Sequence, residues 1–187
     1  MNLIQATSEY INHINRLNDR LNFYAKTIEF KCIDLSEAVQ LGELPSEVRD
    51  LENCIYYIQL ENVSEEDVRN ISKYISELKN TDKSTKYPKV NQFQKNPINT
   101  TLYIGKSKGK LKNRFRSHIK AKPKTTFGLH LENWITNEQF KHIQLRLYYA
   151  EIHFINENNA NEKEEILEML ESSLHLQAQP LLGRSGH

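Results

Sequence analysis

The spacing of apolar residues switches along this chain of 187 residues between the period of a helix and the period of a strand. Residues 143–149 alternate between apolar and mostly polar side chains, which is typical of a strand with one buried face. Residues 8–24 instead place apolar side chains at steps of four and three, on one side of a helix. Because both periods occur, the sequence predicts a mixed α/β (α+β) fold, and its length suits one domain with additions.

Two further strands are expected at the two tyrosine-containing triplets of the chain. Residues 53–60 are rich in aromatic and β-branched side chains, and residues 100–105 form a second segment of this kind. Together with the alternating segment they predict a short, three-stranded sheet flanked by helices. Residues 27–33 are expected to be extended, and Gly42 and Pro45 are expected to interrupt the chain before the next element.

A helix is predicted between the first two strands. Ser64 is expected to cap it, because acidic residues fill the first turn and apolar residues recur at helical spacing beyond it. This helix and the polar residues after it form an insertion at 61–99, within a domain that spans residues 53–187. Residues 1–52 are expected to be an N-terminal helical extension.

Three helices are predicted after the second strand. Lys108 to Lys120 forms the first, with Pro123 as its end, and residues 127–135 and 161–176 form the others. Their expected buried side chains are Leu111, Phe115 and Ile119, then Phe127, Leu131, Trp134 and Ile135, and then Ile166, Leu167, Leu170 and Leu174.

The composition argues against a membrane-spanning chain. Hydrophobic residues make up 38% of the sequence, enough for a core, but no apolar run approaches the roughly 20 residues of a membrane span. The N-terminal residues do not have the layout of a signal peptide, so a cytoplasmic location is expected. Cys32 and Cys54 are isolated, and both are expected to be small buried side chains in a reducing compartment.

The net charge of +1 conceals a long basic stretch. From Lys83 to Leu131 there is no Asp or Glu, whereas acidic residues gather between Glu151 and Glu171. A basic surface attracts polyanions and makes their binding depend on salt, although a solvated lysine-rich face is the plainer interpretation. The candidate nucleic-acid contacts within this stretch are Lys106, Lys108, Lys110, Lys112 and Arg116.

Five side chains spread along the chain have the chemical types that phosphodiester hydrolysis needs. Tyrosine, arginine, histidine and one carboxylate can activate a water, bind a phosphate and hold one divalent metal ion. Each has a plainer interpretation too, as a core tyrosine, a structural histidine or a glutamate paired with a lysine. The carboxylate is singled out because leucines flank it at helical spacing, where an unpaired charge is costly. The five candidates are Tyr56, Tyr103, Arg114, His118 and Glu171.

The order of these residues resembles that of the GIY-YIG nuclease superfamily, over about residues 53–182. The matching segments are Cys54-Ile55-Tyr56, Tyr103-Ile104-Gly105 followed by Lys106, the helix with Arg114 and His118 four residues apart, and Glu171-x-x-Leu174 with Pro180 beyond it. The departures from the family pattern are Cys54 in place of a glycine, the long interval at 57–102, and Gly183 where many members have asparagine.

The resemblance implies a role for each of these residues. In this family the first tyrosine is a general base or a relay that orients the attacking water, which suggests this role for Tyr56. Tyr103 would position water or phosphate, Arg114 would contact the scissile phosphate, and His118 would bind phosphate or assist proton transfer. Lys106 would neutralise a phosphate nearby. Tyr57 competes with Tyr56 in register but would face the opposite side of the strand.

The activity that the resemblance implies is Mg²⁺-dependent DNA cleavage, with Glu171 as the sole metal ligand and Mn²⁺ as an alternative ion. The insertion and the N-terminal extension favour a restriction or defence enzyme. A repair or mobile-element nuclease, an inactive member that only binds nucleic acid, and an enzyme acting on RNA are the alternatives. A homodimer would suit a palindromic site, and the apolar stripe from Tyr10 to Tyr24 either supplies that contact or packs on the domain.

Overall fold

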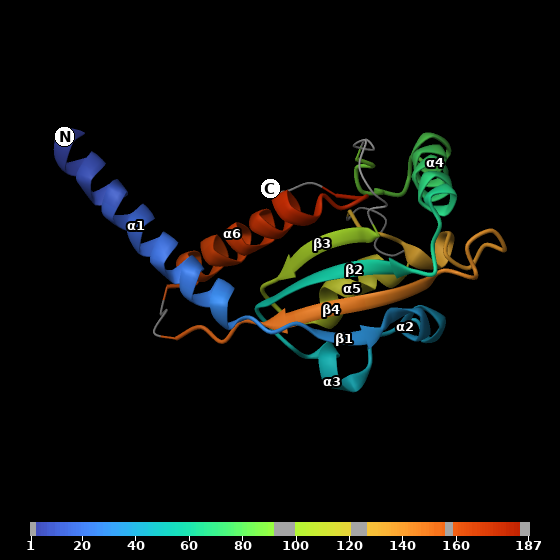
Figure 1. Cartoon of the computed structure of the whole chain (residues 1–187), viewed down its shortest axis with the longest axis horizontal. Helices are drawn as coiled ribbons and strands as arrows, with labels where there is room; N and C mark the ends of the chain where they lie inside the picture. The colour runs from blue at the N-terminus through green and yellow to red at the C-terminus, as the bar shows by residue number, and fades with distance from the viewer. Residues whose placement is uncertain (1–2, 92–99, 121–126, 156–158, 184–187) are drawn as a thin grey trace.

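The structure, a computed structural model, describes residues 3–91, 100–120, 127–155 and 159–183. At its centre is a four-stranded antiparallel sheet in the order β1-β4-β2-β3 (Figure 1). The strands are β1 (Lys31–Asp34), β2 (Cys54–Glu61), β3 (Thr101–Ser107) and β4 (Gln144–Glu151). The predicted mixed α/β class is confirmed, but the prediction of three strands is wrong, because β1 adds a fourth.

The segment before the first predicted strand is built into the sheet. Lys31–Asp34 pairs with residues 146–149 of β4, which gives backbone partners to the edge of β4 that faces away from β2. Cys32 is exposed there, so the prediction that both cysteines are buried is correct only for Cys54.

Two short helices that the sequence did not predict follow β1. Gly42 ends α2 (Leu35–Leu41) at φ 76°, a left-handed conformation that suits glycine, and Pro45 directly precedes α3 (Ser46–Arg49). Gly42 and Pro45 interrupt the chain as predicted, and the interruption lies between these two helices. Apolar side chains of both helices and of the connection between them join the same core as the later strands, namely Leu35, Ala38, Val39, Leu44 and Val48.

The longer helices follow the apolar spacing of the sequence. In α4 (Glu65–Thr81), Ser64 and Asp67 form a reciprocal capping box, and the interior side chains Val68, Ile71 and Ile75 are buried. In α5 (Leu111–Ile119) the whole predicted ridge of Leu111, Phe115 and Ile119 is buried. In α6 (Ala160–Ala178) the predicted side chains Ile166, Leu167 and Leu170 are buried, while Leu174 is partly buried.

The predicted helix at 127–135 is wrong. Only a single 3₁₀ turn forms, η1 (Leu131–Asn133), preceded by His130 at φ 48°. Phe127 is exposed, whereas Leu131, Trp134 and Ile135 are buried as expected. The apolar spacing thus predicted burial correctly for three of the four side chains, but a left-handed residue interrupts the backbone that a helix would need. Pro123, the predicted end of α5, lies outside the described residues.

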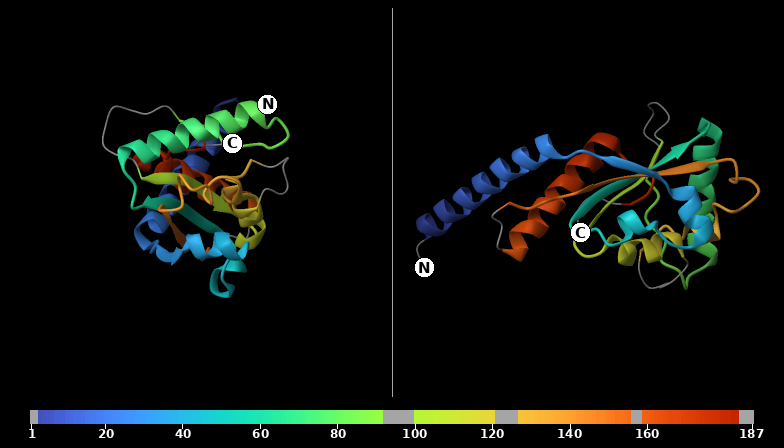
Figure 2. Two further views of the ribbon diagram at one scale, coloured as in Figure 1. Left: turned by 90° about the vertical axis from the view of Figure 1, so that its right-hand side faces the viewer. Right: turned by 90° about the horizontal axis from the view of Figure 1, so that it is seen from below.

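Two hydrophobic clusters cover the two faces of the sheet. The larger includes Tyr56 and Phe115 on the α5 side, and the smaller joins Ile55 and Ala150 to α1 (Leu3–Thr27) and α6. Figure 2 shows that the N-terminal half of α1 stands clear of the rest, while its C-terminal half lies beside α6. Within the predicted stripe, Leu17 and Tyr24 are accordingly buried and Tyr10 is exposed.

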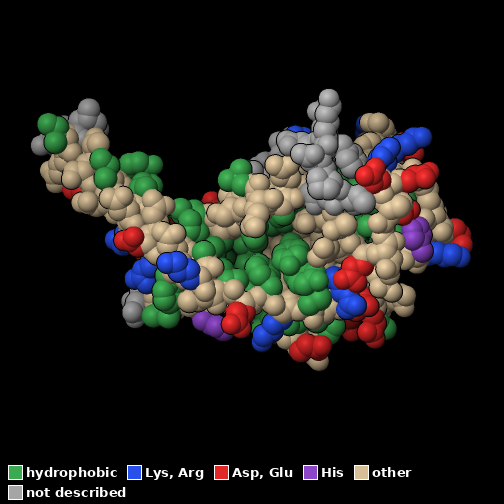
Figure 3. Space-filling view, in the orientation of Figure 1, with side chains coloured by type: hydrophobic (Ala, Val, Ile, Leu, Met, Phe, Trp, Pro, Cys, Tyr) green, Lys and Arg blue, Asp and Glu red, His purple; other side chains and the backbone are tan. Residues whose placement is uncertain are grey.

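The sheet face away from α5 is only partly covered. Tyr57 and Tyr148 stack there with ring centroids 4.6 Å apart, and both side chains are partly exposed. Figure 3 shows apolar side chains gathered over the middle of this face. None of the described helices is long and apolar enough to span a bilayer.

Candidate active site

The structure brings the two triplet tyrosines to a single guanidinium group. Nε of Arg114 donates to the hydroxyl oxygen of Tyr56 at 3.2 Å, and Nη2 donates to the hydroxyl oxygen of Tyr103 at 2.8 Å. The two phenol rings stack loosely, with centroids 6.4 Å apart. The Arg114 side chain, which comes from α5, therefore contacts the neighbouring strands β2 and β3 through the hydroxyl groups of both tyrosines.

His118 also contacts the hydroxyl group of Tyr56. Its Nε2 lies 2.8 Å from the Tyr56 hydroxyl, and its Nδ1 accepts a hydrogen bond from the backbone N–H of Leu129 at 3.3 Å. Because Nδ1 is an acceptor, a neutral ring carries its proton on Nε2 and donates it to Tyr56. Burial, helped by the charge of Arg114, holds the pKa of His118 well below its ordinary value, so the neutral ring is the expected form.

The hydroxyl oxygen of Tyr56 thus receives two hydrogen bonds. Both donors favour a phenolate, yet burial raises the pKa of Tyr56 above its ordinary value and outweighs the opposing effect of Arg114. Tyr56 is 0% exposed and Tyr103 is 9% exposed, so Tyr103 lies nearer to solvent. Burial raises the pKa of Tyr103 as well.

The glycine of the second triplet is required by close packing. Tyr56 lies opposite Gly105 in the β2–β3 ladder. A β-carbon on Gly105 would lie 2.6 Å from the hydroxyl oxygen of Tyr56 and 2.9 Å from the ring of Tyr103. Only glycine at this position therefore lets both phenols reach Arg114.

The strand register decides between the two candidate tyrosines of β2. Tyr57 is the next residue in the strand and points to the opposite face, where it stacks on Tyr148 and contacts the ring of Phe30. Tyr56 is the residue that faces Arg114 and His118. The alternation of strand side chains, which the sequence already supplies, is sufficient for this assignment.

Glu171 lies close to this cluster but does not bond directly to it among the described residues. Its side chain is 14% exposed, and Oε2 is 3.9 Å from Nζ of Lys106. That amine is engaged more closely by Glu168, whose Oε1 is 2.6 Å away. Burial raises the pKa of Glu171, against the lowering effects of Lys106 and Arg114, so its charge is incompletely compensated.

This setting fits a divalent cation. A partly buried carboxylate that lacks a close partner of its own would be stabilised by a metal ion, and Mg²⁺ keeps several waters when one carboxylate holds it. In the described part of the chain there is no group of three or more His, Cys, Asp or Glu side chains suited to a metal ion. A metal site here would be built on Glu171 alone.

The predicted nucleic-acid lysines have acidic neighbours that the sequence did not indicate. Lys106 pairs with Glu168 and Lys108 with Glu164, both on α6 and one helical turn apart. The other two pairs involve Asp50, which lies 3.2 Å from Nζ of Lys110 and 2.8 Å from Nζ of Lys112. Four lysines of the acid-free stretch are thus paired with acids from elsewhere in the chain. The sequence does contain one indication of these pairs, because the spacing of Glu164, Glu168 and Glu171 places three carboxylates on one helix face.

Arg116 lies on another side of α5 from Arg114, as its position two residues further along predicts. It is exposed and lines a cavity together with Lys112 and Lys120. Within the described residues neither Arg116 nor Lys120 forms an ion pair.

Comparisons of this chain with models of protein families, with curated proteins and with solved structures found no match.

Proposed function

We propose that this protein is a Mg²⁺-dependent DNA endonuclease of the GIY-YIG type. The observation that carries the proposal is the bonding of one arginine to both triplet tyrosines, with a partly buried carboxylate beside them. The resemblance rests on residues far apart in the sequence, and four of them are in direct contact in the fold.

Arg114 is the proposed phosphate ligand. In the described structure its partners are two neutral phenols and, at 3.5 Å, the carbonyl oxygen of Phe127. Both phenols are neutral acceptors, whereas a phosphate oxygen is negatively charged and can accept two parallel hydrogen bonds from one guanidinium. A scissile phosphate would therefore draw the guanidinium toward itself and loosen its hold on both phenols, which uncovers Tyr56 and Tyr103.

Tyr56 is the proposed base. In its phenolate form, Tyr56 would take a proton from the attacking water as the water oxygen bonds to phosphorus. The bond between phosphorus and the leaving oxygen would break, and that oxygen would depart with the bonding electron pair and take a proton from solvent water. His118 donates to that oxygen, so it would keep the oxygen in place and favour its deprotonated form after the guanidinium of Arg114 has moved toward the phosphate. Tyr103 would orient the water or the phosphate, and Arg114 would offset charge that develops on the phosphate oxygens.

Glu171 is the proposed holder of the metal ion. Bound Mg²⁺ would supply charge neutralisation at the phosphate. Lys106, next to Gly105 on β3, pairs with Glu168 and lies 3.9 Å from Glu171, so it is placed to balance this acidic pair. A role in restriction or defence is part of the proposal because of the long N-terminal helix α1 and the helix α4 between β2 and β3.

Plasmid cleavage in the presence of Mg²⁺ tests the proposal. Glu171→Gln is expected to reduce the cleavage rate at least about a hundredfold while duplex retention in a gel-shift assay stays near the wild-type level. Glu164→Gln is the matched control, because this glutamate is on the same helix but pairs with Lys108 at the surface. Equal rates for wild type and Glu171→Gln would refute the metal assignment. Binding without any cleavage by the wild type would identify an inactive nucleic-acid-binding member.

A further inference from the structure

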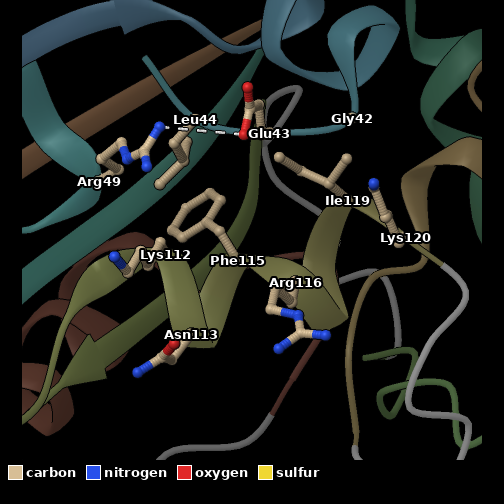
Figure 4. A pocket seen from close by; sticks show the side chains of 10 residues that line it. All are labelled: Gly42, Glu43, Leu44, Arg49, Lys112, Asn113, Phe115, Arg116, Ile119 and Lys120. Carbon is tan, nitrogen blue, oxygen red and sulfur yellow. Dashed lines mark ion pairs between the residues drawn. The ribbon is translucent and has the colours of Figure 1, made fainter. Parts of the chain in front are cut away.

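A cavity of about 320 Å³ lies between α5 and the connection from α2 to α3 (Figure 4). Its floor is apolar, formed by Leu44, Phe115 and Ile119, all of them almost fully buried. Figure 4 shows cationic side chains around this floor: Arg49, Lys112, Arg116 and Lys120. The single acid in the lining is Glu43, 4.0 Å from Arg49.

Three of the four cations form one row, which we call the basic stripe. Lys112, Arg116 and Lys120 are four residues apart along α5 and its C-cap, so they follow one side of the helix. Like charges at this spacing destabilise a helix unless an anion lies against them. The side chain of Lys120 packs directly over Gly42, since a β-carbon on that glycine would lie 2.8 Å from Cε of Lys120.

The neighbouring acids do not balance the stripe. Asp50 pairs with Lys112 at 2.8 Å, but it is shared with Arg49 at 3.7 Å and Lys110 at 3.2 Å. Arg116 and Lys120 make no ion pair within the described ranges, and both are exposed. The surface around the cavity therefore keeps an excess of positive charge, which attracts anions.

We propose that the basic stripe binds backbone phosphates of the DNA, away from the phosphate that is cleaved. This inference rests on the proposed function, and it adds a second contact surface to the same substrate. From Lys112 to Lys120 the stripe rises by eight helical steps, or about 12 Å, whereas phosphates repeat about every 3.4 Å along the axis of one strand. Its length therefore suits a run of consecutive phosphates better than a single ion.

The two sides of α5 would then contact different parts of the DNA backbone. Arg114 faces the two tyrosines, whereas Arg116 faces the cavity, so one short helix would hold the scissile phosphate and a second part of the backbone. The apolar floor is too well covered to stack on a base, because Phe115 and Ile119 are each 1% exposed. The contacts would be electrostatic and independent of sequence.

The test is the salt dependence of duplex binding, measured by fluorescence anisotropy with a labelled oligonucleotide and Glu171→Gln as the parent. Adding Lys112→Gln, Arg116→Gln and Lys120→Gln is expected to lower the slope of log K against log salt by about 2 to 3, at roughly 0.9 for each lost phosphate contact. A matched control removes Arg69, Lys73 and Lys141, which have the same charges but lie away from the cavity. Circular dichroism melting checks that both variants fold.

An equal slope for the stripe variant and the control would overturn the inference, even if plasmid is cut. A lower slope for the stripe variant, together with no plasmid cleavage by the wild type, would instead refute the proposed endonuclease activity but support the phosphate-binding surface. Calorimetric titration with pyrophosphate tests whether the stripe binds a free phosphate ligand and not the DNA backbone. If pyrophosphate binds the parent but not the stripe variant while the DNA slope is unchanged, the cavity serves a free phosphate ligand and the DNA inference is wrong.

Discussion

The hydroxyl oxygen of Tyr56 lies 2.8 Å from Nε2 of His118, so residues 62 positions apart in the chain share one buried hydrogen bond. Arg114, one helical turn before His118, donates to the same oxygen. The helix α5 thus holds the phenol from two positions on one of its sides. A histidine predicted to serve chemistry directly has, in the fold, the geometry of a positioning residue.

Tyr56→Phe is expected to lower both stability and cleavage. Loss of the hydroxyl leaves the donors on His118 and Arg114 without their acceptor, which should reduce the free energy of unfolding by about 1–3 kcal/mol. Cleavage should fall at least about a hundredfold. Urea denaturation and a plasmid assay measure the two effects.

Tyr57→Phe is the control for that change. Its hydroxyl is on the opposite face of β2 and its ring would keep the stack on Tyr148, so stability should change by less than about 0.5 kcal/mol and cleavage should be unaffected. If the two variants behave alike, the assignment of Tyr56 as the reacting tyrosine is wrong.

The cleavage rate should increase with pH across the neutral and mildly alkaline range. Burial raises the pKa of Tyr56 above its ordinary value, so near pH 7 only a small fraction is phenolate, and this fraction grows about tenfold per pH unit. A base of this kind predicts a slope of about one in a plot of log rate against pH. Single-turnover rates from pH 7 to 9 provide the measurement. A flat profile would show that Tyr56 does not act as the base.

Gly105→Ala should destabilise the fold by about 1–3 kcal/mol through overpacking, because the new methyl group would meet the hydroxyl of Tyr56 at 2.6 Å. It should also displace the phenol from Arg114 and reduce cleavage. Gly109→Ala, in the connection just after β3, is the matched control, since nothing lies within 4 Å of its added β-carbon. Thermal melts of the two variants test the difference, and equal melting temperatures would contradict the close packing.

Much of the local structure could be predicted from spacing alone. The alternation along β4, the capping box of α4 and the apolar ridge of α5 each depend on neighbours in the sequence, and all three are confirmed. The segment 127–135 shows the limit of this approach. Its apolar side chains are mostly buried as predicted, but His130 at φ 48° prevents the helix, and spacing reports burial without reporting backbone conformation.

The sequence by itself determined which chemical groups stand on which element, because helix and strand periods fix the side that each residue faces. It placed Tyr56 and Tyr57 on opposite faces and Arg114 apart from Arg116. Only the tertiary structure decided that β1 completes the sheet, that Asp50, Glu164 and Glu168 lie beside the predicted DNA-binding lysines, and that the Tyr56 hydroxyl is covered. These outcomes depend on distances between residues far apart in the chain, which no local pattern encodes.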